Sequence, residues 1–189
     1  MIGSLFERLF GTPLPPLQEG RPGTALLGAL GSGDYGLLRT AAATIALSRE
    51  ATLLDDLALQ LPYVEAARAR YTTDPQWIRE HYELDFVLRK LRHWRDHDGC
   101  LCQLYPHWMH YEPGREIASG HVVLIATGVA EDGWGDTQDA TCTVCGRGWR
   151  CTDREYHAPW WEWSALPETC GRTEGKDTLN PLSQKDPLA

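Results

Sequence analysis

The 189-residue sequence predicts an α+β fold, in which an N-terminal helical part packs on a C-terminal antiparallel β module. Leucine and alanine recur at helical spacing as far as about residue 97. From residue 100 onward glycine, β-branched and aromatic residues replace them, and all six cysteines lie in this part. We therefore expect a helical domain over residues 1–98, a β domain over 99–166 and a polar tail over 167–189.

The N-terminal residues predict neither a targeting segment nor a membrane anchor. Charged side chains interrupt residues 1–10 before any apolar region of useful length, which indicates a short amphipathic helix or turn and not a signal peptide. A proline-rich connector follows over residues 11–23. No uncharged apolar stretch approaches the roughly 20 residues that a membrane-spanning helix needs. We expect a soluble cytoplasmic protein whose thiols stay reduced.

Three short helices are expected after the connector. The first spans residues 26–30 and ends at the glycines that follow. Asp34 is a suitable N-cap for the second, which carries apolar residues as far as residue 46. The third spans residues 53–61 and is closed by Pro62, which cannot continue a helix interior.

A long helix is expected next. Asp74 is a favourable N-cap and Pro75 a favourable first helical residue, so the helix can run over residues 75–97. One stripe of this helix is apolar at helical spacing and comprises Trp77, Leu84, Leu88 and Leu91. Core packing explains the stripe more simply than a groove for a partner does.

The C-terminal half predicts short strands separated by glycine-rich or acidic loops. The expected strands are Cys100 to Tyr105, Ile117 to Thr127, and Arg147 to Tyr156. A turn at Cys145 and Gly146 precedes the last of them. This pattern is typical of a small antiparallel sheet.

Four cysteines have the spacing of metal ligands: Cys100, Cys102, Cys142 and Cys145. Two cysteines separated by two residues can bind one metal through a tight turn, and Gly146 directly after the second pair permits the backbone conformation of that turn. Two such corners would complete a tetrahedral structural zinc site. The one-residue gap in the first pair is less usual than a gap of two.

Several alternatives remain open for these side chains. The four cysteines could be ordinary buried thiols, or could pair as disulfides in an oxidising compartment. His107, His110 and His157 are close enough in sequence to replace Cys100 or Cys102 as ligands. Cys151 and Cys170 are expected to take no part in the site.

The sequence also approaches the motif of one enzyme class, the zinc deaminases. His110 and Glu112, followed by the pair Cys142 and Cys145, approach the zinc deaminase pattern of a histidine ligand, a glutamate proton shuttle and paired cysteines. Thr141 stands where that pattern has proline, and Pro113 with Gly114 argues against the helix that carries its histidine and glutamate. The chain also lacks the common nucleophile and phosphate-binding motifs. We expect a protein that is not an enzyme.

The charge distribution points to a basic protein partner. The formal net charge is −8, and residues 99–189 account for −6 of it, with 7 basic and 13 acidic side chains. A strongly anionic surface repels phosphate backbones and acidic lipid headgroups, so nucleic acid and membranes are unfavourable ligands.

Two segments are candidates for the partner surface. The first is an expected loop over residues 131–139 with four acidic residues, one tryptophan and no basic residue. The second is an aromatic cluster near residue 160, because tryptophan is a frequent interface anchor. The candidate residues are Glu131, Asp132, Trp134, Asp136, Asp139, Trp160 and Trp161. A simple solvated turn and tryptophans that join the sheet to the helices are the alternatives.

The motifs also resemble known families. Leu26-Leu27-x-x-Leu30, Leu38-Arg39-x-Ala41-Ala42 and Ala51-x-Leu53-Leu54 resemble one HEAT-type helical hairpin. The segment 141–149 is similar to a zinc knuckle that leads into a zinc-ribbon strand. With the tyrosine, histidine, proline and consecutive tryptophans over 156–161, the combination resembles small bacterial immunity proteins that neutralise interbacterial toxins.

The resemblance implies a zinc-containing protein that acts by occlusion, its acidic and aromatic surface covering the basic site of a toxin domain. A second possibility is a zinc-ribbon adaptor in a regulatory complex, although ribbons that bind nucleic acid expect basic residues with interleaved aromatics. The acidic ribbon of this sequence has the opposite charge.

Overall fold

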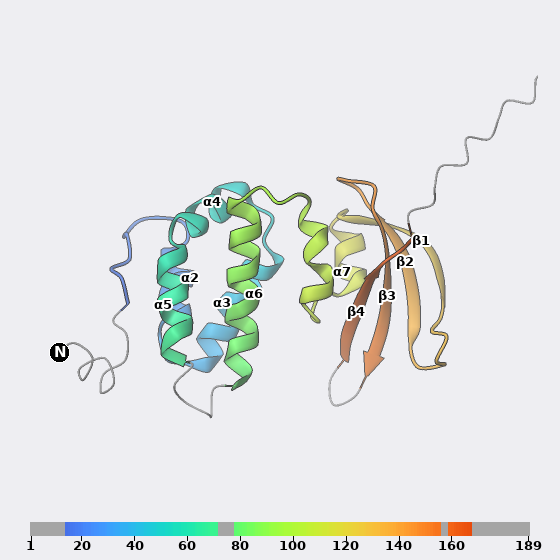
Figure 1. The fold of residues 1–189 in the computed structure, drawn as a ribbon, viewed down its shortest axis with the longest axis horizontal. Coiled ribbons are helices and arrows are strands. Elements are labelled where there is room, and N and C mark those ends of the chain that lie inside the picture. The colour runs from blue at the N-terminus through green and yellow to red at the C-terminus, as the bar shows by residue number, and fades with distance from the viewer. Residues whose placement is uncertain (1–13, 72–77, 156–158, 168–189) are drawn as a thin grey trace, which may run out of the picture.

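A computed structural model describes residues 14–71, 78–155 and 159–167 of the chain. It confirms the α+β class, with the helices in the N-terminal part and a four-stranded antiparallel sheet in the C-terminal part (Figure 1). The expected N-terminal turn, Asp74, Pro75, Trp77, His157, Cys170 and nearly all of the tail lie outside the described residues. None of the helices in the described ranges combines the length and the apolar character that crossing a bilayer requires.

Four helices open the described chain: α2 (Thr24–Leu30), α3 (Tyr35–Leu47), α4 (Ala51–Leu59) and α5 (Leu61–Tyr71). Asp34 caps α3 as predicted, because its side chain accepts a hydrogen bond from the Leu37 backbone N–H. The expected third helix ends earlier than predicted, and Pro62 does not close it. Pro62 lies instead in the first turn of α5, where its missing N–H has no intrahelical partner to lose.

The long helix α6 (Ile78–Arg95) completes the helical part. Leu84, Leu88 and Leu91 are buried in the first hydrophobic core with residues of α2 to α5, which confirms their predicted packing role. The core also contains Leu27, Leu38, Leu57 and Val64. No cysteine belongs to this core among the described residues.

The first predicted strand, Cys100 to Tyr105, is wrong. The segment forms the 3-10 helix η2 (Leu101–His107), which buries Cys102, Leu104 and Tyr105. A strand would need backbone hydrogen bonds to a neighbouring strand. The backbone of this segment instead forms local hydrogen bonds, such as the one from Gln103 N to Cys100 O at 3.0 Å.

The second predicted strand begins later than expected. Residues Pro113–Ala118 form the short helix α7, with Pro113 at its N-terminus, and Gly120 follows at a positive φ of 72°. The strand β1 then spans Val122–Val129. Pro113 therefore begins a helix, but His110 and Glu112 precede it, so they do not lie on a helical turn together.

The sheet continues with β2 (Asp136–Cys142), β3 (Gly148–Glu155) and β4 (Pro159–Ala165), in the order β1-β2-β3-β4. The third predicted strand is confirmed as β3. The expected acidic loop over residues 131–139 is shorter than predicted, because Asp136 and Asp139 belong to β2. They pair there with Val129 and with Ala126 and Arg150 of the flanking strands.

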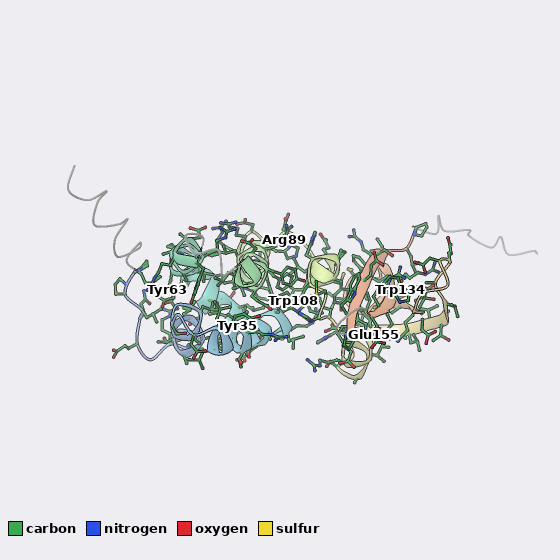
Figure 2. All side chains as sticks on the ribbon, turned by 90° about the horizontal axis from the view of Figure 1, so that it is seen from below. Tyr35, Tyr63, Arg89, Trp108, Trp134 and Glu155 are labelled. Atoms are coloured by element: carbon green, nitrogen blue, oxygen red, sulfur yellow. The ribbon has the colours of Figure 1, made fainter. Side chains whose placement is uncertain are left out.

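A second hydrophobic core joins the helices to the sheet. The short helices η2 and α7 lie between the helical part and β4 (Figure 1). Trp108 lies in this middle region, whereas Trp134 lies out on the sheet (Figure 2). The buried residues of the core are Ala46, Phe86, Cys102, Leu104, Tyr105, Trp108, Tyr111, Val122, Ala140, Cys142, Trp149, Cys151 and Trp163. Two of the candidate metal ligands therefore lie in the contact between the two parts.

Candidate metal centre

The four predicted cysteines come together in space. Cys100 immediately precedes η2 and Cys102 lies in its first turn, whereas Cys142 ends β2 and Cys145 lies in the turn before β3. Their Sγ atoms all lie within 4.8 Å of one another. Cys100 Sγ is 3.6 Å from Cys142 Sγ, and Cys102 Sγ is 3.4 Å from Cys145 Sγ. Four sulfurs around a tetrahedral ion with bonds of 2.3 Å would be about 3.8 Å apart. The cluster can therefore hold one metal ion.

The turn between β2 and β3 directs the second cysteine pair toward the cluster. Gly146 N donates to Cys142 O at 2.9 Å, and Cys142 N donates to Arg147 O at 2.9 Å. Gly146 has a φ of 73°, which favours glycine at that position. The expectation of a tight turn ending in Gly146 is confirmed.

The backbone around the cluster favours negative charge on the Cys142 thiol. Burial raises the pKa of Cys100 and of Cys102. Burial also acts to raise the pKa of Cys142, but the backbone N–H groups of Cys145 and Val144 donate to its sulfur and leave the pKa below its usual value. A bound cation would stabilise all four thiolates in the same way and more strongly.

An indole lies beside the first cysteine pair. Trp149 Nε1 is buried and has no partner at hydrogen-bonding geometry among the described atoms. Burial raises the pKa of Cys102, and an interaction with the Trp149 side chain acts in the opposite direction. This N–H is a ready donor to a metal-bound sulfur, and such contacts orient and tune the ligands of a metal site.

Of the alternative ligands, Cys151, His107 and His110 are not part of the cluster. Cys151 is buried in β3, outside the group of four. His110 makes edge contacts with the rings of Tyr82 and Trp108, and burial lowers its pKa. His107 lines a separate groove. The ligand group among the described residues therefore consists of four sulfurs and contains no histidine.

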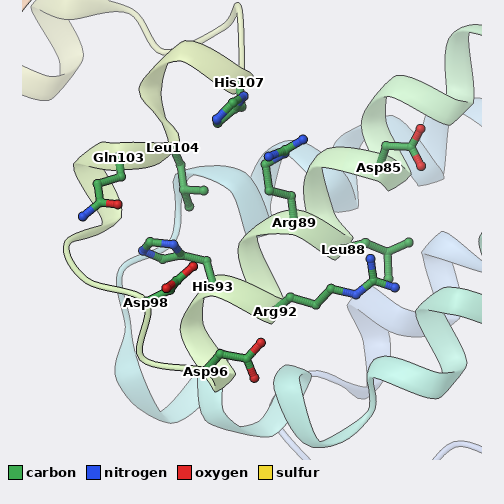
Figure 3. A pocket seen from close by; sticks show the side chains of 10 residues that line it. All are labelled: Asp85, Leu88, Arg89, Arg92, His93, Asp96, Asp98, Gln103, Leu104 and His107. Carbon is green, nitrogen blue, oxygen red and sulfur yellow. The ribbon is translucent and has the colours of Figure 1, made fainter. Parts of the chain in front are cut away.

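That groove is a feature that sequence reasoning missed. It encloses about 600 Å³ between the C-terminal half of α6 and η2, and its lining includes Arg89, His93, Asp98 and His107 (Figure 3). His93 Nε2 is buried there without a hydrogen-bond partner among the described atoms. Both signs of charge are present, so the lining favours no one class of ligand.

A buried ionic network also escaped prediction. Glu116 Oε2 accepts hydrogen bonds from Arg49 Nη2 at 2.9 Å and Tyr105 Oη at 2.7 Å, and lies 2.9 Å from His121 Nδ1. The nearby Lys90 donates to the Ala46 and Ser48 carbonyls. The network connects the end of α3 to η2 and α7, and these long sequence separations leave no local signal.

The acidic segment is partly neutralised within its own sheet. Asp139 forms a bidentate ion pair with Arg150, and Arg154 Nη1 donates to both carboxylate oxygens of Asp132. Both arginines are on β3. Trp134 is 52% exposed, and the Arg154 guanidinium lies 5.7 Å from its ring centre. The segment itself contains no basic residue, but two arginines of β3 neutralise part of its charge in the fold.

The remaining partner candidates lie at the same end of the sheet. Glu131 and Asp136 are exposed, and no ion pair involves either of them within the described ranges. Trp161 packs partly against the second core, whereas Trp160 is half-buried at the neighbouring position of β4. Because β2 runs from Asp136 to Cys142, these acidic residues and the cysteine cluster lie at opposite ends of the sheet.

Comparisons with known proteins give no relationship: the chain matches no family model, and no curated protein or solved structure is significantly similar to it.

Proposed function

We propose that the chain is a zinc-containing binding protein without enzymatic activity, which neutralises a basic bacterial toxin domain by covering its active site. The observation that carries the first half of this proposal is the closed cluster of four thiols in the contact between helices and sheet. The acidic end of the sheet supports the second half.

The ligand chemistry favours a structural zinc ion. Four thiolates are a common ligand set for zinc and fill its tetrahedral shell, which leaves no position for a reactive water. A zinc deaminase would need such a position beside a glutamate. Glu112 precedes α7 with a side chain that is 46% exposed, and the four cysteines already account for a full set of ligands.

The charge of the molecule favours a basic partner. Four thiolates with one divalent cation carry a formal charge of about −2, which adds to the −8 of the side chains. Glu131, Asp136 and the exposed Trp134 lie together on the β1–β2 hairpin. A basic active site would be attracted to this end of the sheet, and a tryptophan can anchor the contact.

The test uses the protein encoded beside this chain. That protein should be toxic when expressed alone, and co-expression with this chain should restore growth. The double variant Glu131→Lys and Asp136→Lys should weaken binding at least tenfold and lose the rescue, because it reverses the free charges. A matched control is Glu19→Lys with Glu50→Lys, which makes the same change of charge at exposed positions of the helical part.

Two results would contradict the proposal. A neighbouring protein that is harmless, or that does not bind this chain, removes the immunity function. Rescue that survives the hairpin double variant as well as it survives the control removes the acidic surface as its cause.

A further inference from the structure

The two edges of the sheet differ in how they are covered. At the β4 edge, Trp161 N donates to Met109 O at 2.9 Å, and Trp163 Nε1 donates to Tyr111 O at 2.7 Å. The segment around η2 thus covers that edge, as Figure 1 shows. A covered edge cannot accept another strand.

Beyond its buried first residue, Val122, the β1 edge is open within the described residues. β1 pairs with β2 on one side, and no other strand of the described chain pairs with it. Val123, Ile125 and Val129 are 55%, 64% and 68% exposed. The strand contains neither a charged residue nor a proline over its eight residues, and one register irregularity between Leu124 and Ala126 is its only departure from regular pairing. Natural edge strands are usually protected by charged residues, proline or bulges, and β1 has only the single irregularity at Ile125. The regularly paired parts of β1 on either side of it are therefore a place where a strand can be added.

The charges at the end of β1 indicate what kind of strand would be added. Glu131 follows the strand closely, and Asp136 pairs with Val129 at the strand's last residue. A second copy of this chain would bring another net charge of −8 to the same edge, which opposes self-pairing. A segment with apolar side chains in the middle and basic side chains at one end fits both the strand and its acidic end.

We propose that β1 accepts an extended segment of a basic protein partner as a fifth strand of the sheet. The inference rests on the proposed function, since it names the contact by which the basic partner is held. Main-chain hydrogen bonds along β1 supply affinity, and the exposed valine and isoleucine side chains select apolar residues at alternate positions of the segment. Lysine or arginine at the end of the segment contacts Glu131 and Asp136.

The first experiment uses a synthetic twelve-residue peptide with alternating threonine and valine followed by three lysines. It should bind the full chain with a dissociation constant that rises at least tenfold between low and high salt. The same peptide with glutamates in place of the lysines should bind at least tenfold more weakly. Hydrogen exchange of the β1 amides that do not bond to β2 should be fast in the free protein and slow in the complex, because strand addition supplies their missing partners.

Variants separate edge pairing from general apolar contact. Ile125→Lys and Val123→Lys place a charge on the exposed edge, and each should weaken peptide binding at least tenfold. The matched control is Leu59→Lys, which makes the same change at a helical residue that is 72% exposed, and it should bind as the wild type does. Circular dichroism checks that each variant is folded. If one of the two edge variants does not fold, the other still provides the test.

Several outcomes overturn the inference. One is that the Leu59→Lys variant loses as much peptide binding as the β1 variants do. Another is that the peptide does not slow hydrogen exchange of the β1 amides. A third is that the outward β1 amides are already protected in the free chain, either by residues 168–189 or by a second copy seen in sedimentation. If the neighbouring protein is neutralised equally well by the Ile125→Lys variant, the edge contact fails while the proposed function stands. If the wild type gives no rescue and yet binds the peptide, the proposed function fails and the edge contact stands.

Discussion

Glu116 is the centre of the buried ionic network between the helical part and the sheet. Its side chain is only 4% exposed, and it faces Arg49 from the helical part and Tyr105 and His121 from the connecting segments. A buried charge pair costs desolvation, but removing one member leaves the other charge uncompensated. The network therefore requires a negatively charged side chain at residue 116.

The substitution Glu116→Gln should lower the free energy of unfolding by about 3 kcal/mol, because it leaves the half-buried Arg49 guanidinium without a counter-charge. Chemical denaturation measures the loss. The matched control is Glu112→Gln, in which an exposed carboxylate near the same helix changes in the same way and the loss should stay within about 0.5 kcal/mol. Equal losses in the two variants would show that the buried network contributes little.

The burial of Lys90 predicts a pH dependence of the protein's stability. Its ammonium group is almost fully buried, and burial lowers its pKa to about 7, with Arg49 acting in the same direction and Glu116 opposing it. The unfolded value is about 10.4, so folding releases a proton between these two pH values. Stability then rises with pH in that window.

Between pH 7 and pH 9 the wild type should gain about 1 kcal/mol per pH unit relative to the variant Lys90→Met, which lacks the titrating group. Urea denaturation at several pH values gives the two curves. The measurement compares slopes, so a uniform loss of stability in the variant does not affect it. Parallel curves would contradict the lowered pKa.

At the scale of elements, the β1–β2 turn depends on one glycine. Ala130 N donates to Gly135 O at 2.9 Å, which closes the turn, and Gly135 has a φ of 104°. A Cβ atom at this residue would lie 1.9 Å from Asp153 O of β3, which leaves no space for any side chain. The turn that carries Trp134 is therefore fixed against β3.

The variant Gly135→Ala should lose roughly 3 kcal/mol of stability and accelerate hydrogen exchange in β1 and β2, since both the backbone angle and the contact are unfavourable. Gly133→Ala is the control. Gly133 also has a positive φ, of 72°, but its Cβ would meet nothing within 4 Å, so only about 1 kcal/mol should be lost. A Gly135 variant that is no less stable than the control would show that the turn is not fixed in this way.

Local signals explain which elements the sequence predicted. The Asp34 cap and the Gly146 turn depend on neighbouring residues, so their patterns could be recognised directly. Pro62 could not be assigned from its neighbours, because proline both ends helices and begins them. The acidic strand β2 was missed because Asp139 depends on Arg150, a residue that only the fold brings close.

The same distinction applies to the candidate site. The spacing of Cys142 and Cys145 predicted one half of the cysteine cluster. Cys100 and Cys102 form the other half as predicted, although their segment is helical and was expected to be a strand. The open edge of β1 was not predicted, because edge positions depend on the order of strands in the sheet.

At the scale of the molecule, the protein has two separate hydrophobic cores. The helical core contains no cysteine among its described members, whereas the second core contains Cys102 and Cys142 together with Tyr105, Trp108 and Trp149. Structural zinc contributes directly to the folding free energy of the region that it holds. The two cores should therefore respond differently to loss of metal.

Removal of the metal with a strong chelator should change the near-ultraviolet circular dichroism of the aromatic core, while most of the far-ultraviolet helical signal is kept. Addition of zinc should restore the aromatic signal, which serves as the control for irreversible damage. Simultaneous loss of both signals would contradict two separable cores, and an unchanged aromatic signal would contradict a structural role for the metal.

The central claim is that the four cysteines hold one structural zinc ion, and X-ray absorption at the zinc edge on the purified chain tests it most directly. We predict one zinc per chain with a single shell of four sulfur ligands at about 2.3 Å. A shell that contains nitrogen or oxygen ligands, or a purified chain that folds without bound zinc, would contradict the claim.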